Sequence, residues 1–178
     1  MKIVLQPMPQ PDDGGVCIGT LDGVPLTYRG QDLYAGDRHV TMQEAGSAFV
    51  DAVNEAATAV LGHEWVTSLA RLMQLNKRST SRDRIAKFGL PEYVCRFLAV
   101  ASTHPYPRAL GHALLCVEAI QEAHTTARYT SGRPSQIDLA GRDMDAQETM
   151  RRALAAVDEV LGERERFRAR KETPLTGV

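Results

Sequence analysis

The chain has 178 residues, of which 43% are hydrophobic and 24% are charged, and its formal net charge at pH 7 is −1. These values lie near the averages for soluble globular proteins. The balanced charge excludes an overall electrostatic attraction to nucleic acid or to a membrane surface. A chain of this length buries roughly two thirds of its unfolded surface without disulfides or metals, so we expect one domain, or a small domain with appendages.

The cysteines and the first residues bear on location. Cys17, Cys95 and Cys116 are widely spaced and include no CxxC pair, and three cysteines cannot form a closed disulfide framework. We therefore expect free thiols and a reducing cytoplasm. The opening segment MKIVLQPMPQP carries one charged side chain and lacks a long apolar core, so we expect no signal peptide. No stretch approaches eighteen apolar residues, and we expect no membrane span.

The first 40 residues predict short strands. The segment VCIGTLDGVPLTY carries Asp22-Gly23 between two semi-alternating apolar runs, which is typical of a two-residue hairpin turn with both residues at positive φ. The segment DLYAGDRHV adds a third strand, broken at Gly36-Asp37, and residues 9–15 form a loop. We predict a small antiparallel β-hairpin or meander over residues 1–40.

From residue 41 to 128 the apolar residues follow a helical period. The first helix begins with a capping box formed by Thr41 and Glu44 and ends at Gly62. Three more helices follow, the third of the four starting at Pro91, and the fourth is apolar enough to be central in the core. The four apolar stripes are Phe49, Val53, Ala56 and Val60; Trp65, Leu69, Leu72 and Met73; Val94, Phe97, Leu98 and Ala101; and Leu110, Leu114, Val117 and Ile120.

Residues 129–143, YTSGRPSQIDLAGRD, are rich in Gly, Ser and Pro and predict a loop. Residues 144–178 predict an amphipathic helix followed by a charged tail, GERERFRARKE, that we expect to fray. The stripe of this helix either packs inside the same domain or pairs with a second copy in a homodimer; it consists of Met150, Leu154, Val157 and Leu161. The predicted fold class is mainly α (α+β), a helical bundle with a small N-terminal antiparallel hairpin or meander.

Charge is distributed unevenly along the chain. Residues 1–65 hold three bases and nine acids, whereas residues 66–96, the basic segment, hold seven bases and two acids. Such a basic island in a neutral protein is the pattern of a local anion-binding face. Its bases are Arg71, Lys77, Arg78, Arg82, Arg84, Lys87 and Arg96, against Asp83 and Glu92.

Residues 66–88 fit the pattern of a helix-turn-helix. This motif needs apolar residues that lock two short helices, and an outward face of Arg, Lys, Ser or Asn for phosphates and base edges. Leu69, Ala70 and Met73 would form the support helix, residues 75–77 the turn, and residues 78–85 the recognition helix. In this register WVTSLARLMQLNKRSTSRDRIAKFGLP resembles the Cro and lambda-repressor-like regulators of phages and mobile elements, with LPEYVCRFL as the proline-led helix that follows.

The resemblance covers residues 65–94 and implies a small transcriptional regulator that binds double-stranded DNA, commonly as a dimer, without a cofactor. Arg78, Arg82 and Arg84 would touch base edges or phosphates. The other contacts would hold the DNA backbone, and the complete predicted interface is Lys77, Arg78, Ser79, Ser81, Arg82, Arg84 and Lys87.

A second interpretation starts from the two inward positions of that recognition helix, which are Thr80 and Asp83. Together they form a capping signature in front of an apolar run. Residues 76–79 would then be a loop, and residues 81–88 a short connecting helix closed by Gly89. The bases would form a solvated rim, and the protein would be an interaction module, an inhibitor or adaptor of phage type, docking through the edge of its N-terminal sheet or through the basic segment.

The remaining motifs predict no enzyme. His63-Glu64 begins like a zinc-protease helix, but Thr67 stands where the second histidine is needed. The chain contains no phosphate-binding glycine loop, nucleophile elbow or dinucleotide fingerprint. We therefore expect no catalytic residues, no metal site and no cofactor.

Overall fold

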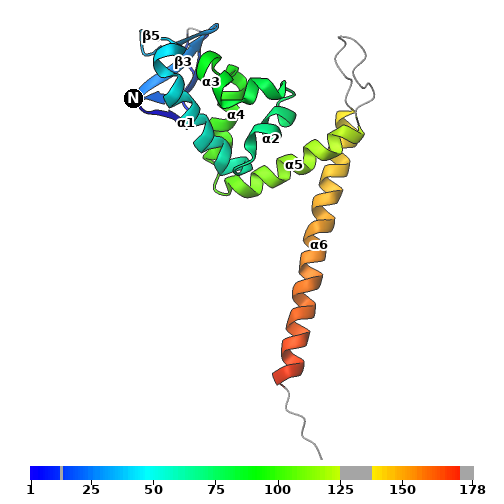
Figure 1. Cartoon of the computed structure of the whole chain (residues 1–178). Coiled ribbons are helices and arrows are strands. Elements are labelled where there is room, and N and C mark those ends of the chain that lie inside the picture. Colours follow the sequence, from blue (N-terminus) through cyan, green and yellow to red (C-terminus); the bar gives the residue numbers. More distant parts are fainter. Residues whose placement is uncertain (13, 125–137, 173–178) are drawn as a thin grey trace, which may run out of the picture. The chain divides into compact units, whose positions relative to one another are not determined.

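The computed structural model describes residues 1–12, 14–124 and 138–172, with backbone alone at 122 and 169–172 (Figure 1). The chain divides into two compact units, residues 1–118 and 119–178, and each is considered by itself. The first unit combines helices with an antiparallel sheet, so the predicted α+β class is confirmed. None of the described helices has the length and apolar character needed to cross a membrane.

The sheet is a five-stranded antiparallel meander in the order β1-β2-β3-β4-β5. Asp22 and Gly23 join the second and third strands with φ of 48° and 85°, so the predicted turn with two positive φ values is confirmed. The predicted third strand is itself a hairpin, since its two halves pair across the turn at Gly36. The strands are β1 Ile3–Leu5, β2 Val16–Leu21, β3 Val24–Arg29, β4 Asp32–Ala35 and β5 Arg38–Val40.

The helices begin and end where local signals place them. Thr41 caps the first helix, because its Oγ1 accepts a hydrogen bond from the Glu44 N–H at 3.3 Å. Gly62 ends this helix at φ 82°, where glycine avoids the strain that a Cβ would bring. The elements are α1 Met42–Leu61, α2 Trp65–Leu72, the 3₁₀-helix η1 Lys77–Thr80, α3 Arg82–Phe88, α4 Glu92–Ser102 and α5 Pro107–Ala123.

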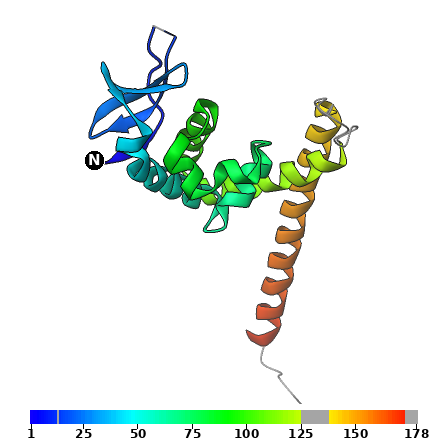
Figure 2. The ribbon, with the colours of Figure 1, turned by 45° about the horizontal axis from the view of Figure 1, so that its top comes forward.

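The core lies between the sheet and helices α1 and α4, which contact β1 and β2, and Figure 2 shows the sheet beside α1. The predicted α1 stripe is buried, with Phe49, Val53 and Val60 fully inaccessible to solvent. In contrast, the predicted stripe of α5 is only half-buried along its whole length. The expectation that this helix is central in the core was wrong, because α1 and α4 occupy that position.

The second unit contains the end of α5 and the long helix α6, Leu139–Glu172. A loop over residues 129–143 was predicted, but residues 139–143 are helical and residues 129–137 lie outside the described part. Asp138 explains the early start, because its Oδ1 accepts a hydrogen bond from the Gly141 N–H at 3.0 Å as a helix cap does. The predicted fraying was also wrong up to Glu172; residues 173–178 lie outside the described part.

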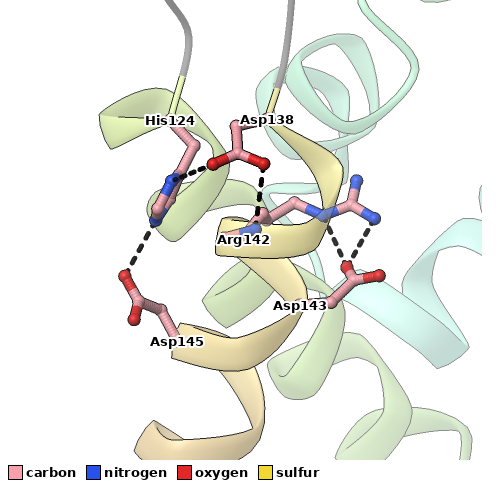
Figure 3. Close-up of polar contacts among 6 residues, drawn as sticks. His124, Asp138, Arg142, Asp143 and Asp145 are labelled. Atoms are coloured by element: carbon pink, nitrogen blue, oxygen red, sulfur yellow. Dashed lines mark hydrogen bonds and ion pairs between the residues drawn. The ribbon is translucent and has the colours of Figure 1, made fainter.

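Ionic contacts join α5 to the start of α6 (Figure 3). His124 Nε2 lies 2.8 Å from Asp145 Oδ2, and His124 Nδ1 lies 3.9 Å from Asp138 Oδ2. Arg142 contacts Asp143 at 2.7 Å and donates to Gln121 Oε1 at 3.0 Å. The ionic contacts of His124 with described side chains are both to carboxylates at the start of α6. The cluster therefore holds the end of α5 and the start of α6 together.

Candidate nucleic-acid interface

The predicted recognition helix over residues 78–85 is not present, because the chain is extended at Ser81. Ser81 has φ −69° and ψ 143°, so it ends η1 at Thr80 and precedes the first residue of α3. This ψ is incompatible with a continuing helix. Residues 77–88 thus form a 3₁₀ turn and a separate helix, which agrees closely with the alternative prediction of a short connecting helix closed by Gly89.

Thr80 explains the break, and its role differs from both predictions. The side chain is fully buried, and its hydroxyl donates to the carbonyl oxygens of Val66 and Lys77, each at 3.0 Å. It therefore anchors η1 to α2 and does not cap α3, whose cap residue is Ser81. Asp83, an inward position of the predicted recognition helix, is exposed to solvent. No carboxylate is therefore buried in the core at this position.

The break creates a groove of about 550 Å³ between η1 and α3. Three cations, Arg78, Arg84 and Lys87, line it against the single carboxylate of Asp83. Asn76 shapes one wall, since its Oδ1 accepts a hydrogen bond from the Arg78 N–H at 2.9 Å. The complete lining is Asn76, Arg78, Ser79, Ser81, Asp83, Arg84, Lys87 and Phe88.

The lining of the groove includes an exposed aromatic ring. Phe88 is 55% exposed, with the Arg84 guanidinium 4.3 Å and the Lys87 ammonium 5.2 Å from its ring centroid. Cation–π contacts of this kind hold long side chains in place over a ring. A second groove of about 490 Å³ shares Ser79, Arg84 and Phe88 with the first. Arg84 consequently lies where the two grooves meet.

Two predicted contact residues lie outside the lining of this groove. Arg82 turns back to α1 and donates to Asn54 Oδ1 at 2.9 Å. The same oxygen accepts a hydrogen bond from the Trp65 indole N–H at 3.1 Å, so Arg82 is part of a contact between α1, α2 and α3. Lys77 is exposed at the start of η1. The other five predicted residues, Arg78, Ser79, Ser81, Arg84 and Lys87, come together in the groove.

Sequence reasoning missed Phe88 as a member of the site and assigned Asp83 to a cap. The spacing of four between Arg84 and Phe88 places both on one face of a helix, and this signal was available once α3 was read as the helix. Asp83 follows from the same reading, because it lies on the opposite side from buried Ile85. Phe88 was missed because the predicted recognition helix ended at Ile85, and Asp83 was assigned to a cap because the alternative interpretation paired it with Thr80.

Close backbone packing positions α3. A Cβ on Gly46 of α1 would overlap the carbonyl of Ala86 in α3, so the absent side chain lets the two backbones meet. Gly89 ends α3 at φ 71° beside the hydroxyl of Tyr28. That hydroxyl donates to the Leu90 carbonyl at 3.0 Å. The end of α3 that carries Phe88 is thus fixed against the sheet.

The buried titratable groups near this region are held neutral. Burial, together with the nearby Cys95 and Glu92, raises the pKa of the Tyr28 hydroxyl well above its ordinary value of 10.0. Burial likewise raises the pKa of the Cys95 thiol well above 9.0. A thiol held neutral is a poor nucleophile. Within the described part of the chain, no three His, Cys, Asp or Glu side chains are grouped to hold a metal ion.

Comparison with family models, with curated proteins and with solved structures found no match to this chain. The resemblance of residues 65–94 to Cro-like regulators therefore remains a prediction from those residues.

Proposed function

We propose that the protein binds double-stranded DNA through the groove between η1 and α3, by contacts to backbone phosphates. The observation that carries this proposal is the convergence of Arg78, Arg84 and Lys87 around one concave surface with a single acid. Arginine and lysine side chains supply most phosphate contacts in protein–DNA complexes. The function is one of binding, with no catalytic step and no cofactor.

The proposed mode differs from that of a helix-turn-helix regulator. A recognition helix presents several side chains to base edges in the major groove, whereas α3 has seven residues and Arg84 and Lys87 are held over Phe88. We expect phosphate contacts to dominate and sequence preference to be modest. A role in transcription would then depend less on direct reading of bases than on other contacts that bring the protein to a particular DNA site.

The test is a fluorescence-anisotropy titration with a random-sequence duplex at about 50 and 200 mM salt. Three phosphate contacts predict a loss of affinity of roughly 40-fold across that range. The triple variant Arg78→Gln, Arg84→Gln, Lys87→Gln should lose both the binding and its salt dependence. The matched control is a triple replacement of exposed bases outside the groove, Lys2→Gln, Lys77→Gln and Arg96→Gln, which removes the same charge and should bind nearly as the natural chain does.

Three results would overturn the proposal. Absence of binding at the lower salt concentration would remove nucleic acid as the ligand of the groove. Equal loss in the two triple variants would show that only net charge matters. Tighter binding to a single strand of the same sequence would replace the duplex by single-stranded DNA, for which an exposed ring such as Phe88 offers a stacking surface.

A protein partner is the second candidate. Exposed apolar side chains on α4, namely Tyr93 at 52% and Val100 at 61% exposure, favour it. An inhibitor or adaptor would use such side chains together with the basic groove as its docking surface. Pull-down with the natural chain and the groove triple variant tests this second function. A partner that the natural chain binds and the triple variant does not bind supports it. Recovery of no partner with either chain contradicts it.

A further inference from the structure

The apolar stripe of α6 is exposed to solvent along its whole length. Leu154 is 66%, Val157 55% and Val160 63% exposed, and the neighbouring stripe residues Met150 and Leu161 are similarly open. Large apolar side chains that lie side by side on a helix usually cover a surface. These side chains occupy the middle of a continuous 34-residue helix.

The spacing of the stripe is that of a two-helix seam. Met150, Leu154, Val157 and Leu161 recur at intervals of four, three and four residues, and Ala153 and Val160 widen the same face. Intervals that alternate in this way keep apolar side chains facing one partner helix. The opposite face is polar or small, with Arg152, Ala155 and Glu159. A second helix is therefore the natural occupant of this face.

The charges at the two ends of the seam determine which helix fits and in which direction. Continued at the same spacing, the seam contains Asp143 and Gln147 before the stripe and Arg164 and Arg168 after it. In a parallel pair of identical helices each residue faces its own copy, so the two arginine positions would repel one another. In an antiparallel pair aligned so that Leu154 of one helix faces Val157 of the other, Asp143 faces Arg168 and Gln147 faces Arg164. Polar residues at seam positions are known to select among the possible alignments of two helices.

The flank of the stripe shows the same complementarity. Arg151 and Asp158 lie on the same edge of the seam, one full heptad apart. When Leu154 of one helix faces Val157 of the other, Arg151 of each copy lies beside Asp158 of its neighbour, and the two-fold symmetry makes this contact twice. Within its own helix Arg151 contacts Glu148 at 2.7 Å, an exposed pairing that leaves the guanidinium accessible.

We propose that α6 pairs antiparallel with α6 of a second copy of this chain, with Leu154 of each helix facing Val157 of the other. This inference depends on α6 alone and stands whether or not the groove of the first unit binds DNA. Of the two arrangements expected from the sequence, internal packing and a homodimer, the proposal selects the homodimer and gives it one orientation and one register.

The state of assembly is tested by sedimentation equilibrium of the full chain at micromolar concentration. The natural chain should be a dimer. Leu154→Glu buries a carboxylate in the seam and should weaken dimerisation by about tenfold or more. The matched control Ala155→Glu adds the same charge on the opposite face and should leave the dimer intact. Circular dichroism checks that both variants keep their helix content. A monomeric natural chain, or equal weakening by both variants, would overturn the proposal.

The orientation is tested by disulfide cross-linking in a Cys116→Ala background, since that cysteine is the half-buried one. Antiparallel pairing places Gln147 of one copy opposite Arg164 of the other, while the two copies of residue 147 lie about 25 Å apart at 1.5 Å per residue. A mixture of Gln147→Cys and Arg164→Cys chains should form a mixed cross-linked dimer. Cross-linking of Gln147→Cys with itself would show a parallel pair, and a dimer without the mixed product would exclude this register.

Discussion

The Thr80 hydroxyl is buried between η1 and α2, where it donates to the carbonyls of Val66 and Lys77. Thr80→Val keeps the shape but leaves the Val66 carbonyl without this donor, and the loss of such a buried hydrogen bond costs about 1 to 3 kcal/mol. We expect the free energy of unfolding, measured with urea, to fall by that amount. Thr80→Ser retains the hydroxyl and should lose less. A smaller loss for Thr80→Val than for Thr80→Ser would mean that the methyl group, and not the hydrogen bond, holds η1 in place.

Glu148 on α6 contacts Arg151 and Arg152, each at 2.7 Å. The hydrogen bond from Arg151, followed by that from Arg152, lowers the pKa of Glu148 from 4.5 to about 2. Because the two hydrogen bonds favour the ionised carboxylate of Glu148 in the folded helix, the stabilisation of α6 is present above pH 4.5 and is lost as the pH falls towards 2. The carboxyl titration followed by NMR should have its midpoint well below 4.5. Arg151→Gln combined with Arg152→Gln should return it to the ordinary value; an unchanged midpoint would contradict the pairing.

At the scale of elements, the packing of α3 against α1 depends on Gly46. Alanine normally stabilises the interior of a helix by about 1 kcal/mol relative to glycine, but a Cβ here would overlap the Ala86 carbonyl. We expect Gly46→Ala to destabilise the first unit by about 1 to 3 kcal/mol, as overpacking does, and to weaken ligand binding in the groove because α3 is displaced.

The matched control is Gly162→Ala in α6, where the nearest atom to an added Cβ lies 3.8 Å away at the end of the Arg166 side chain. This replacement should increase helix content by circular dichroism. A stabilising effect of Gly46→Ala in urea unfolding would show that α1 and α3 are not in close contact.

Elements with local signals could be predicted from the sequence, and elements fixed by distant contacts could not. The β2–β3 hairpin follows from Asp22-Gly23, and α1 from Thr41 and Gly62, because their turn and caps are neighbouring residues. The break at Ser81 depends on a hydrogen bond between Thr80 and Val66, fourteen residues away. The composition of the basic segment indicated the region of the groove, but which of its bases gather there, Arg78, Arg84 and Lys87, depended on the division between η1 and α3 and so on this tertiary contact.

At the scale of the whole molecule, stability should depend on pH at alkaline values. Tyr28 and Cys95 have raised pKa values in the folded protein, and in the unfolded chain they ionise near 10.0 and 9.0. Above these values the folded state holds more protons than the unfolded state, so stability falls as the pH rises, by about 1.4 kcal/mol per pH unit for each group.

Urea unfolding between pH 8 and about 10.5 measures this dependence. Tyr28→Phe should lower stability at pH 8, because the hydrogen bond to Leu90 is lost, and should reduce the decline at higher pH. A natural chain with unchanged stability across this interval would contradict the burial of both groups in their neutral forms.

The central claim is that the groove between η1 and α3 binds the phosphates of DNA, and two single variants with opposite effects test it most directly. Arg84 and Asp83 line the same groove with opposite charges. Anisotropy titration of one duplex at about 50 mM salt compares Arg84→Gln and Asp83→Asn with the natural chain. The proposed binding mode predicts weaker binding for Arg84→Gln and tighter binding for Asp83→Asn. No change for either variant, or changes of the same sign, would contradict it.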